Sequence, residues 1–287
     1  MGRPVDADFE RFRPLLLGLA YRMLGSMWDA EDVVQEAYLR WQRVDRETVE
    51  EPRAFLVTVV SRLALDQLRS ARVKREAYTG PWLPEPVPVD AFGPSDAAEL
   101  RDTLSYATLH LMERLTPPQR AVFVLREAFE LPYEDIAGIV GDTVVNCRQL
   151  HRRAGKQLDR GRDRFRPSPA EHSELLDRFV AAARGGDLDT LKELLSEDVV
   201  AYNDGGGRTR AALRPIEGRD KVLAFVAGLL SRYPIDEIRP AEANGEPAVW
   251  SRLDGQDQLI TLDVRDGRIH AVYGILNPDK LAHVRPA

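Results

Sequence analysis

The chain has 287 residues, which suggests about two domains of ordinary size, and its hydrophobic content of 44% is sufficient for packed cores. Its net charge of −6 excludes a protein that is basic along its whole length. The single cysteine, Cys147, excludes an internal disulfide and a cysteine metal cluster. The polar N-terminus lacks the apolar run of a signal peptide, and no stretch approaches membrane-spanning length. We therefore expect a cytoplasmic protein with no membrane span, no metal and no cofactor.

Residues 6–75 carry apolar side chains at helical spacing and predict three helices in succession. Acidic and amide side chains crowd the start of the second helix, where the helix dipole favours negative charge. These residues are Asp29, Asp32, Gln35 and Glu36. They either complement the dipole or form a docking face for a partner. The third helix begins at Pro52 and ends in basic residues. These residues either contact nucleic acid or only complement the dipole at the C-terminus of the helix.

Residues 76–98 contain five prolines and two glycines, so they predict an extended linker rather than a helix. Trp82 and Leu83 are unusual in a linker. They either fix the linker to its own domain or dock on another part of the chain. Helical spacing resumes at residue 99 and continues to residue 130, with a break at Pro117.

Residues 131–158 predict a helix-turn-helix. The first helix runs from Tyr133 to Val140, Gly141 supplies the turn, and Thr143 caps a second helix that continues through Gln157. The second helix carries side chains that read base edges or neutralise phosphate. They are Asn146, Arg148, Gln149, Arg152, Arg153 and Lys156. The alternative interpretation is an ordinary helical hairpin with a solvated basic face.

From about Pro169 the pattern changes to two helices, a strand, an amphipathic helix and several alternating segments separated by glycine turns. Helices followed by a curled antiparallel meander predict an α+β cone.

Three motifs in the first 160 residues resemble alternative bacterial sigma factors of the extracytoplasmic-function type. They are DAEDVVQEAYLRW, PRAFLVTVVSRLALDQLR and RLTPPQRAVFVLREAFELPYEDIAGIVGDTVVNCRQLHRRA. WLPEP at 82–86, DGGG at 204–207 and NPDKL at 277–281 resemble the SigJ-like subgroup, which carries a SnoaL-like C-terminal domain.

The resemblance implies a multidomain fold with two all-α sigma domains, the second a helix-turn-helix, followed by an α+β SnoaL-like cone. We expect sigma region 2 over residues 1–76, the Pro-rich linker over 77–98, sigma region 4 over 99–166 and the SnoaL-like domain over 169–287. The expected function is that of a sigma factor rather than an enzyme. It would bind RNA polymerase core, direct promoter-specific initiation and be modulated by its own C-terminal domain.

The resemblance also implies roles for individual residues. The acidic face of the second helix would dock on the β′ clamp helices of the polymerase, with the β flap as a further contact of the sigma factor. The −10 element of promoter DNA would be contacted by Arg62, Asp66, Arg69, Lys74 and Arg75. The −35 element would be contacted by Thr143, Asn146, Arg148, Gln149, Arg152, Arg153 and Lys156.

The three subgroup motifs are expected to meet and to set the relation between the two promoter-binding domains. Their residues are Trp82, Leu83, Pro84, Glu85 and Pro86, then Asp204, Gly205, Gly206 and Gly207, then Asn277, Pro278, Asp279, Lys280 and Leu281. The alternative for DGGG is a flexible hairpin turn, and that for NPDKL is a turn that caps the last strand.

Two other functions remain open for the C-terminal domain, because a SnoaL-like cone can enclose a pocket. The pocket would bind a small-molecule effector without chemistry, or it would be catalytic. Candidates for catalysis are Tyr202, Asp204, Arg210 and His270, although the sequence does not place them in one pocket.

Overall fold

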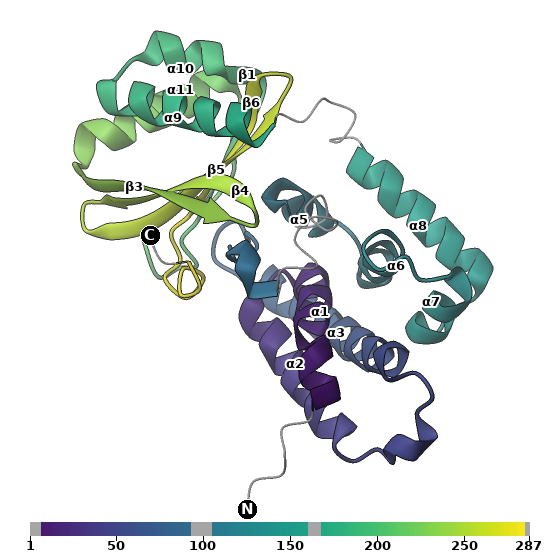
Figure 1. The fold of residues 1–287 in the computed structure, drawn as a ribbon. Helices are drawn as coiled ribbons and strands as arrows, with labels where there is room; N and C mark the ends of the chain where they lie inside the picture. Colours follow the sequence, from purple (N-terminus) through teal and green to yellow (C-terminus); the bar gives the residue numbers. More distant parts are fainter. Residues whose placement is uncertain (1–6, 93–104, 160–167, 285–287) are drawn as a thin grey trace, which may run out of the picture. The chain divides into compact units, whose positions relative to one another are not determined.

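The computed structural model describes residues 7–92, 105–159 and 168–284, which form two compact units (Figure 1). The helical unit comprises residues 1–76, 89–104 and 108–160. The C-terminal unit joins residues 77–88 and 105–107 to residues 161–287. The start of the helix expected from residue 99, the end of the linker and the basic residues after residue 159 lie outside the described ranges.

The helical unit is built from seven α-helices among its described residues, with two short 3-10 turns. The helices are α1 (Ala7–Leu24), α2 (Met27–Trp41), α3 (Pro52–Glu76), α5 (Tyr106–Met112), α6 (Pro117–Glu127), α7 (Tyr133–Val140) and α8 (Val144–Asp159). The turns are η1 (Arg46–Thr48) and η2 (Val89–Phe92). In the described part of the chain no helix is both long enough and apolar enough to cross a membrane.

Local sequence signals fix where these helices begin and end. The Ser26 hydroxyl accepts a hydrogen bond from the Asp29 N–H (3.2 Å) and caps α2. Thr116 and Gln119 form a capping box at the start of α6. Gly141 has φ 74°, a left-handed conformation that favours glycine and ends α7. The predicted helix-turn-helix is therefore confirmed as a local structure.

A buried ion-pair cluster holds the helical unit together. Glu113, just after α5, bonds to Arg75 at the end of α3 and to Arg120 of α6, the latter at 2.6 Å. The guanidinium of Arg120 also donates to the Arg22 carbonyl at the end of α1 (3.0 Å). Burial disfavours the Glu113 carboxylate, but Arg120 and Arg75 outweigh it, so the pKa of Glu113 is lowered.

The C-terminal unit combines three helices with a six-stranded mixed sheet. The helices are α9 (Pro169–Gly185), α10 (Leu188–Leu194) and α11 (Arg219–Arg232). The strands are β1 (Leu195–Asp204), β2 (Ile216–Glu217), β3 (Ile235–Ala243), β4 (Glu246–Leu253), β5 (Gln256–Arg265) and β6 (Arg268–Ile275). Their order in the sheet is β2-β1-β6-β5-β4-β3.

The antiparallel meander expected at the end of the chain is confirmed for β4, β5 and β6. Strand β1 joins this meander in parallel beside β6, so the whole sheet is mixed. Strand β3, which contains Pro240, was not among the strands expected from the sequence. Proline is tolerated there because β3 is the edge strand and pairs only with β4.

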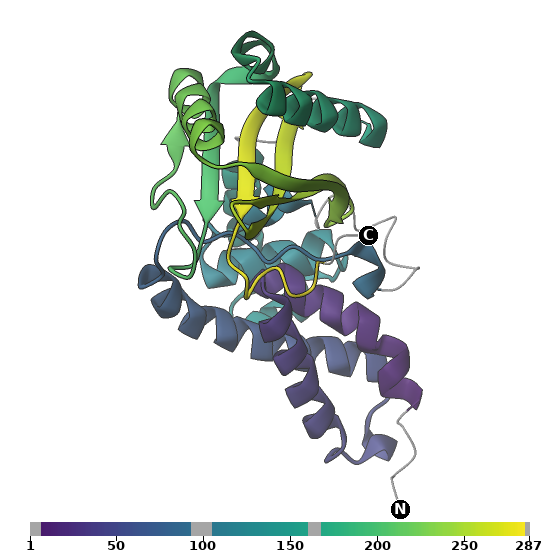
Figure 2. The same ribbon diagram turned by 90° about the vertical axis from the view of Figure 1, so that its left-hand side faces the viewer.

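The two faces of the sheet have different partners. On the inner face, Val249 and Leu262 belong to a core shared with α9, α10 and α11, and Figure 2 shows these helices beside the sheet. On the outer face, Trp250 and Tyr273 pack with Leu83 of the linker and with Tyr106. Linker residues thus complete the hydrophobic core of the C-terminal unit.

We predict that Glu113→Gln destabilises the helical unit by about 3–5 kcal/mol, because it leaves two buried arginines without their carboxylate. Thermal and chemical unfolding of the whole chain measures this. Since the folded pKa of Glu113 is lowered, its contribution is present at neutral pH and is lost as the pH falls through that pKa.

Asp66→Asn is the matched control, because the Asp66–Arg69 ion pair is exposed and should hardly affect unfolding. Equal melting behaviour of the two variants would contradict a structural role for the Glu113 cluster.

Candidate functional site

The predicted polymerase-docking residues lie on one exposed side of α2, with one exception. Asp32, Gln35 and Glu36 are exposed. Asp29 is half-buried, and its carboxylate accepts a hydrogen bond from Gln67 of α3 (3.2 Å). Two apolar residues that sequence reasoning missed are exposed on the same helix. They are Trp28, 53% exposed, and Leu39, 39% exposed.

The spacing of Trp28, Asp32, Gln35, Glu36 and Leu39 is one helical stripe, which was available in the sequence as a signal. Large apolar side chains bordered by acids on a surface are typical of a protein docking site. The side of α2 that faces solvent therefore has both the charge and the apolar area for a partner.

The predicted −10 residues do not share one surface. Arg62, Asp66 and Arg69 are exposed at helical spacing on α3, and Arg69 pairs with Asp66 at 3.2 Å. Arg62 donates a hydrogen bond to the Gly138 carbonyl of α7 (3.0 Å). Arg75 is turned inward to Glu113. Lys74 lies on α3, and its side chain is outside the described part of the structure. Two of the arginines expected to meet DNA are thus engaged by the second half of the helical unit.

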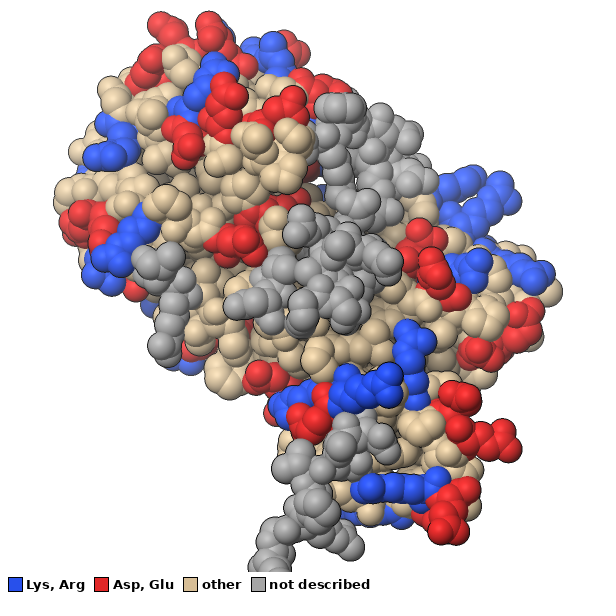
Figure 3. Space-filling view, in the orientation of Figure 1, with Lys and Arg blue, Asp and Glu red and all other residues tan. Residues whose placement is uncertain are grey.

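The second helix of the helix-turn-helix presents a basic face. Arg148, Gln149, Arg152, Arg153 and Lys156 of α8 are exposed at helical spacing. Figure 3 shows Lys and Arg side chains gathered along the outer edge of this helix. Val145, 64% exposed, lies on the same side and was missed by sequence reasoning. An exposed valine beside guanidinium groups is compatible with a thymine methyl group in a major groove.

The polar side chains at the start of α8 make hydrogen bonds within the chain that cap the helix. The Thr143 hydroxyl accepts from the Asn146 N–H (3.1 Å), and the Asn146 amide donates to Asp142 (2.6 Å). Arg148 lies over the Tyr133 ring, 5.4 Å from its centroid. For Arg152 and Lys156 the described residues provide no hydrogen bond or ion pair, so these cations are available to phosphate.

The three subgroup motifs meet at a buried carboxylate in the C-terminal unit. Asp204 ends β1 and is 0% exposed. It accepts hydrogen bonds from the Tyr78 hydroxyl (2.6 Å), the Leu83 N–H (2.9 Å) and the Lys280 ammonium (2.7 Å). We call Asp204 with Tyr78, Leu83 and Lys280 the Asp204 junction.

The Asp204 junction satisfies the conditions that make a buried ion pair favourable. Desolvating two charges is costly unless further hydrogen bonds and good geometry accompany the pair. Here Lys280 also donates to the Leu83 carbonyl and lies 3.4 Å from the Trp82 ring centroid. Burial, and then the hydrogen bond to Asp204, raises the pKa of Tyr78, so its hydroxyl remains a donor.

The glycines of DGGG are required by close packing around the junction. A Cβ at Gly205 would lie 2.6 Å from the Thr209 carbonyl oxygen. A Cβ at Gly206, whose φ is 58°, would lie 2.3 Å from the Asn277 side chain. The Asn277 amide in turn donates to the Tyr78 hydroxyl (2.9 Å). DGGG is therefore a contact motif as well as a turn.

The remaining linker residues are fixed to the same outer sheet face. Glu85 is buried and contacts His283 at 2.6 Å. The Tyr106 hydroxyl donates to the Pro84 carbonyl (2.7 Å), and the Tyr106 N–H donates to Glu246 of β4 (3.0 Å). Pro86 is buried as well. Tyr78, Tyr106 and His283 belong to this site although no sequence motif singled them out.

The other motif residues lie at the rim. Pro278 and Asp279 are exposed, and Asp279 pairs with Arg208 at 3.2 Å. Gly207 has φ 70° and packs against Thr79. Leu281 is half-buried against the outer core.

A separate cavity of about 790 Å³ lies on the inner side of the sheet. Asn203 lines it, and its amide nitrogen is buried without a hydrogen-bond partner in the described structure. The four candidates for catalysis do not gather there. Arg210 lines the cavity and bonds to Tyr233 (2.9 Å). Tyr202 stacks on Tyr273, and Asp204 lies in the junction.

His270, the fourth candidate, lies 3.4 Å from Asp198 rather than in the cavity. Within the described ranges no group of three His, Cys, Asp or Glu side chains is arranged to hold a metal ion. The lining of the cavity includes one carboxylate, Asp254, in the turn after β4. Of the four candidates for catalysis, Arg210 lines this cavity, whereas His270 and Asp204 have their partners elsewhere.

Comparison with known proteins connects these surfaces to one family. Family models match residues 9–73 (Sigma-70 region 2), residues 106–158 (Sigma-70, region 4) and residues 176–272 (SnoaL-like domain). The chain is 41% identical to the ECF RNA polymerase sigma factor SigJ of Mycobacterium tuberculosis, over 96% of this chain and 92% of that protein. It is 28% identical to the ECF RNA polymerase sigma factor SigG of the same species, over 95% and 81% respectively.

The crystal structure of Mycobacterium tuberculosis SigJ matches 98% of this chain and 99% of its own, with a TM-score of 0.81 and 37% sequence identity. The fold class expected from the sequence is confirmed, with two helical sigma domains and a C-terminal SnoaL-like domain that contains a mixed sheet. The chain belongs to the extracytoplasmic-function sigma factors with a SnoaL-like C-terminal domain, which direct promoter-specific transcription initiation.

Proposed function

We propose that the SnoaL-like domain regulates this sigma factor by limiting how far its linker lets region 2 and region 4 separate. The observation that carries the proposal is the 2.7 Å hydrogen bond from the Tyr106 hydroxyl to the Pro84 carbonyl. Both residues are fixed to the outer sheet face, Pro84 through its neighbour Leu83 at Asp204 and Tyr106 through Glu246. Residues 85–105 therefore add nothing to the distance that the linker can span between region 2 and region 4.

The span of the linker, free or fixed, can be compared with the distance between the two promoter elements. Residues 77–105, fully extended, would span at most about 100 Å, at ~3.4 Å per residue. With Pro84 bonded to Tyr106, only residues 77–84 separate α3 from α5, which is about 27 Å at most. Promoter elements about 25 base pairs apart lie roughly 85 Å apart along a straight duplex. Release of the linker thus favours simultaneous contact with both elements, and fixation opposes it.

Contacts inside the helical unit also support the proposal that the fixed linker opposes promoter binding. Arg62, expected at the −10 element, bonds to Gly138 of the helix-turn-helix, and Arg75 is held by Glu113. A promoter complex needs these guanidinium groups to face DNA. The described conformation is therefore the inactive one in our proposal, and the Asp204 junction favours it.

We predict that Asp204→Asn raises promoter-dependent transcription, because it removes the charge that Lys280 pairs with and weakens the hold on Leu83. Run-off transcription with polymerase core and the whole chain measures this. The control is Asp189→Asn, which changes an exposed carboxylate of α10 away from the junction and should leave transcription as it was. A folded Asp204→Asn variant with unchanged run-off product would contradict the regulatory role.

We propose that α8 reads the −35 element while the exposed part of α3 contacts the −10 element, with region 4 also contacting the polymerase β flap. The basic face of α8 supports the first assignment, since its cations are solvent-exposed at the spacing of one helix side. Removing a phosphate contact lowers the salt dependence of DNA binding by about 0.9 in slope.

Arg152→Ala combined with Arg153→Ala should weaken promoter binding by the holoenzyme and reduce the slope of log K against log salt by up to about 1.8. Arg178→Ala, an exposed arginine of α9, is the control and should leave the slope unchanged. An unchanged slope in the double variant would remove α8 from the DNA interface.

We propose that α2 docks on the polymerase β′ clamp helices through its exposed stripe. Asp32→Ala with Glu36→Ala should weaken binding to polymerase core at least tenfold without changing the melting temperature. Glu174→Ala with Asp177→Ala removes two exposed acids from α9 and serves as the control. If both double variants bind core equally well, the docking face lies elsewhere.

The inner cavity supports binding of a small-molecule effector better than catalysis. Its volume is within the range of ligand sites, and the amide of Asn203 has no partner in the described structure. Asn203 is adjacent to Asp204 in β1, so an occupant that bonds to this amide would act next to the junction. Such a compound would raise the melting temperature of the chain without being consumed.

A further inference from the structure

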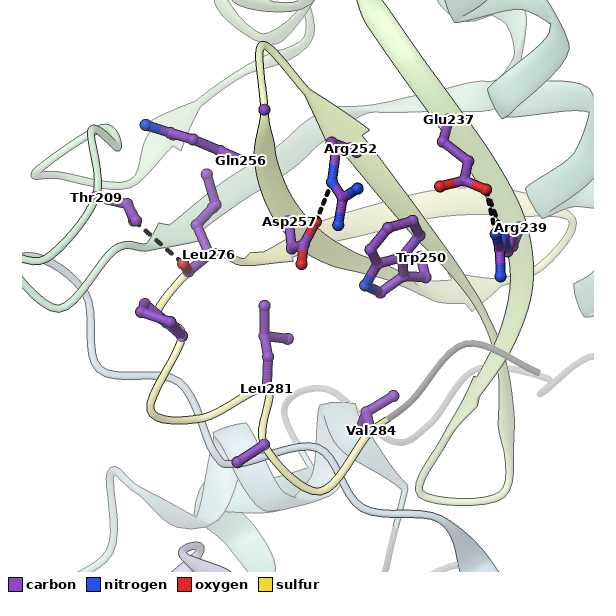
Figure 4. Close-up of a pocket in the computed structure, with 13 residues that line it drawn as sticks. Thr209, Glu237, Arg239, Trp250, Arg252, Gln256, Asp257, Leu276, Leu281 and Val284 are labelled. Carbon is purple, nitrogen blue, oxygen red and sulfur yellow. Dashed lines mark hydrogen bonds and ion pairs between the residues drawn. The ribbon is translucent and has the colours of Figure 1, made fainter.

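A second pocket, of about 690 Å³, lies on the outer face of the sheet, opposite the inner cavity. Its walls come from β3, β4 and β5 on one side and from the C-terminal loop on the other (Figure 4). The loop contributes Leu276, Pro278, Leu281, Ala282 and Val284, which flank Lys280 on both sides. The volume is that of a small-molecule site.

The floor of this outer pocket is apolar, whereas its upper wall carries hydrogen-bond donors. In Figure 4 the nitrogen edge of the Trp250 indole and the guanidinium of Arg252 face the space above Leu281. Trp250 is 5% exposed and lines the outer pocket. An indole N–H that faces the pocket can donate to an acceptor placed there.

The carboxylates of the outer pocket are already occupied by arginines. Arg252 donates through Nε to Asp257 (2.7 Å), and Arg239 donates to Glu237 (2.6 Å). The terminal nitrogens of Arg252 make no other hydrogen bond within the described chain. The terminal nitrogens of Arg252 are therefore available to a ligand whose head group accepts hydrogen bonds.

We propose that the outer pocket binds an amphipathic carboxylate, with its apolar body over Leu281 and Val284 and its acid group at Arg252 and Trp250. A carboxylate accepts from a guanidinium in two-point geometry and from an indole N–H at the same time. A bound ligand would contact the loop that carries Lys280 and would thereby affect the hydrogen bonds of the Asp204 junction. That consequence rests on the proposed regulatory role, whereas the binding itself does not.

The test is binding of 1-naphthaleneacetate to the whole chain by calorimetry, with 1-naphthaleneacetamide as the neutral analogue of equal shape. The acid should bind at least tenfold more tightly than the amide. Arg252→Gln should remove most of that preference. Ala282→Trp, which fills the outer pocket, should abolish binding, whereas Ala224→Trp, which fills the inner cavity, should not.

Three results would overturn the proposal. They are absence of binding to the natural sequence, equal affinity for acid and amide, and binding that survives Ala282→Trp but is lost in Ala224→Trp. Circular dichroism of each variant separates loss of the site from loss of the fold. If Asp204→Asn leaves transcription unchanged while the binding pattern holds, the regulatory proposal fails and the pocket stands.

Discussion

The buried ion pair between Asp204 and Lys280 is the interaction on which the arrangement of the C-terminal unit depends. It lies where the end of β1, the linker and the C-terminal loop meet, three segments that are far apart in the sequence. A carboxylate without water needs several donors, and here the linker supplies Tyr78 and Leu83 while the C-terminal loop supplies Lys280. Removing any one segment would leave a buried charge with too few partners, so the three segments fold as a set.

The helical unit uses the same chemistry, again with a buried carboxylate at the centre. Glu113 is one carboxylate between Arg75 and Arg120, and it joins helices of both sigma regions. Both clusters consist of groups that must be desolvated together. A partner that separates the helices would therefore have to offer the freed arginines another anion, and the phosphates of promoter DNA are such anions.

Helix boundaries, the helix-turn-helix and the fold class were predictable because caps, turns and periodicity are local signals. Gly141 ends α7 and Thr143 caps α8, as their sequence context predicted. Strand β3 was missed because proline at position 240 is tolerated only at a sheet edge, which is a tertiary property. The contacts of Tyr106 and the inward turn of Arg75 were likewise invisible, because each depends on a residue more than twenty positions away.

The bond between Tyr106 and Pro84 has a consequence for how such chains vary. It joins the two ends of residues 85–105, so the length of that segment does not set the distance between Pro84 and Tyr106. Loop closure costs only about 0.6 kcal/mol more for each doubling of length. Under the proposed regulation, insertions and deletions between Phe92 and Ser105 would tune how far the released protein extends, whereas changes at Glu85 to Val87 would also disturb contacts with the sheet.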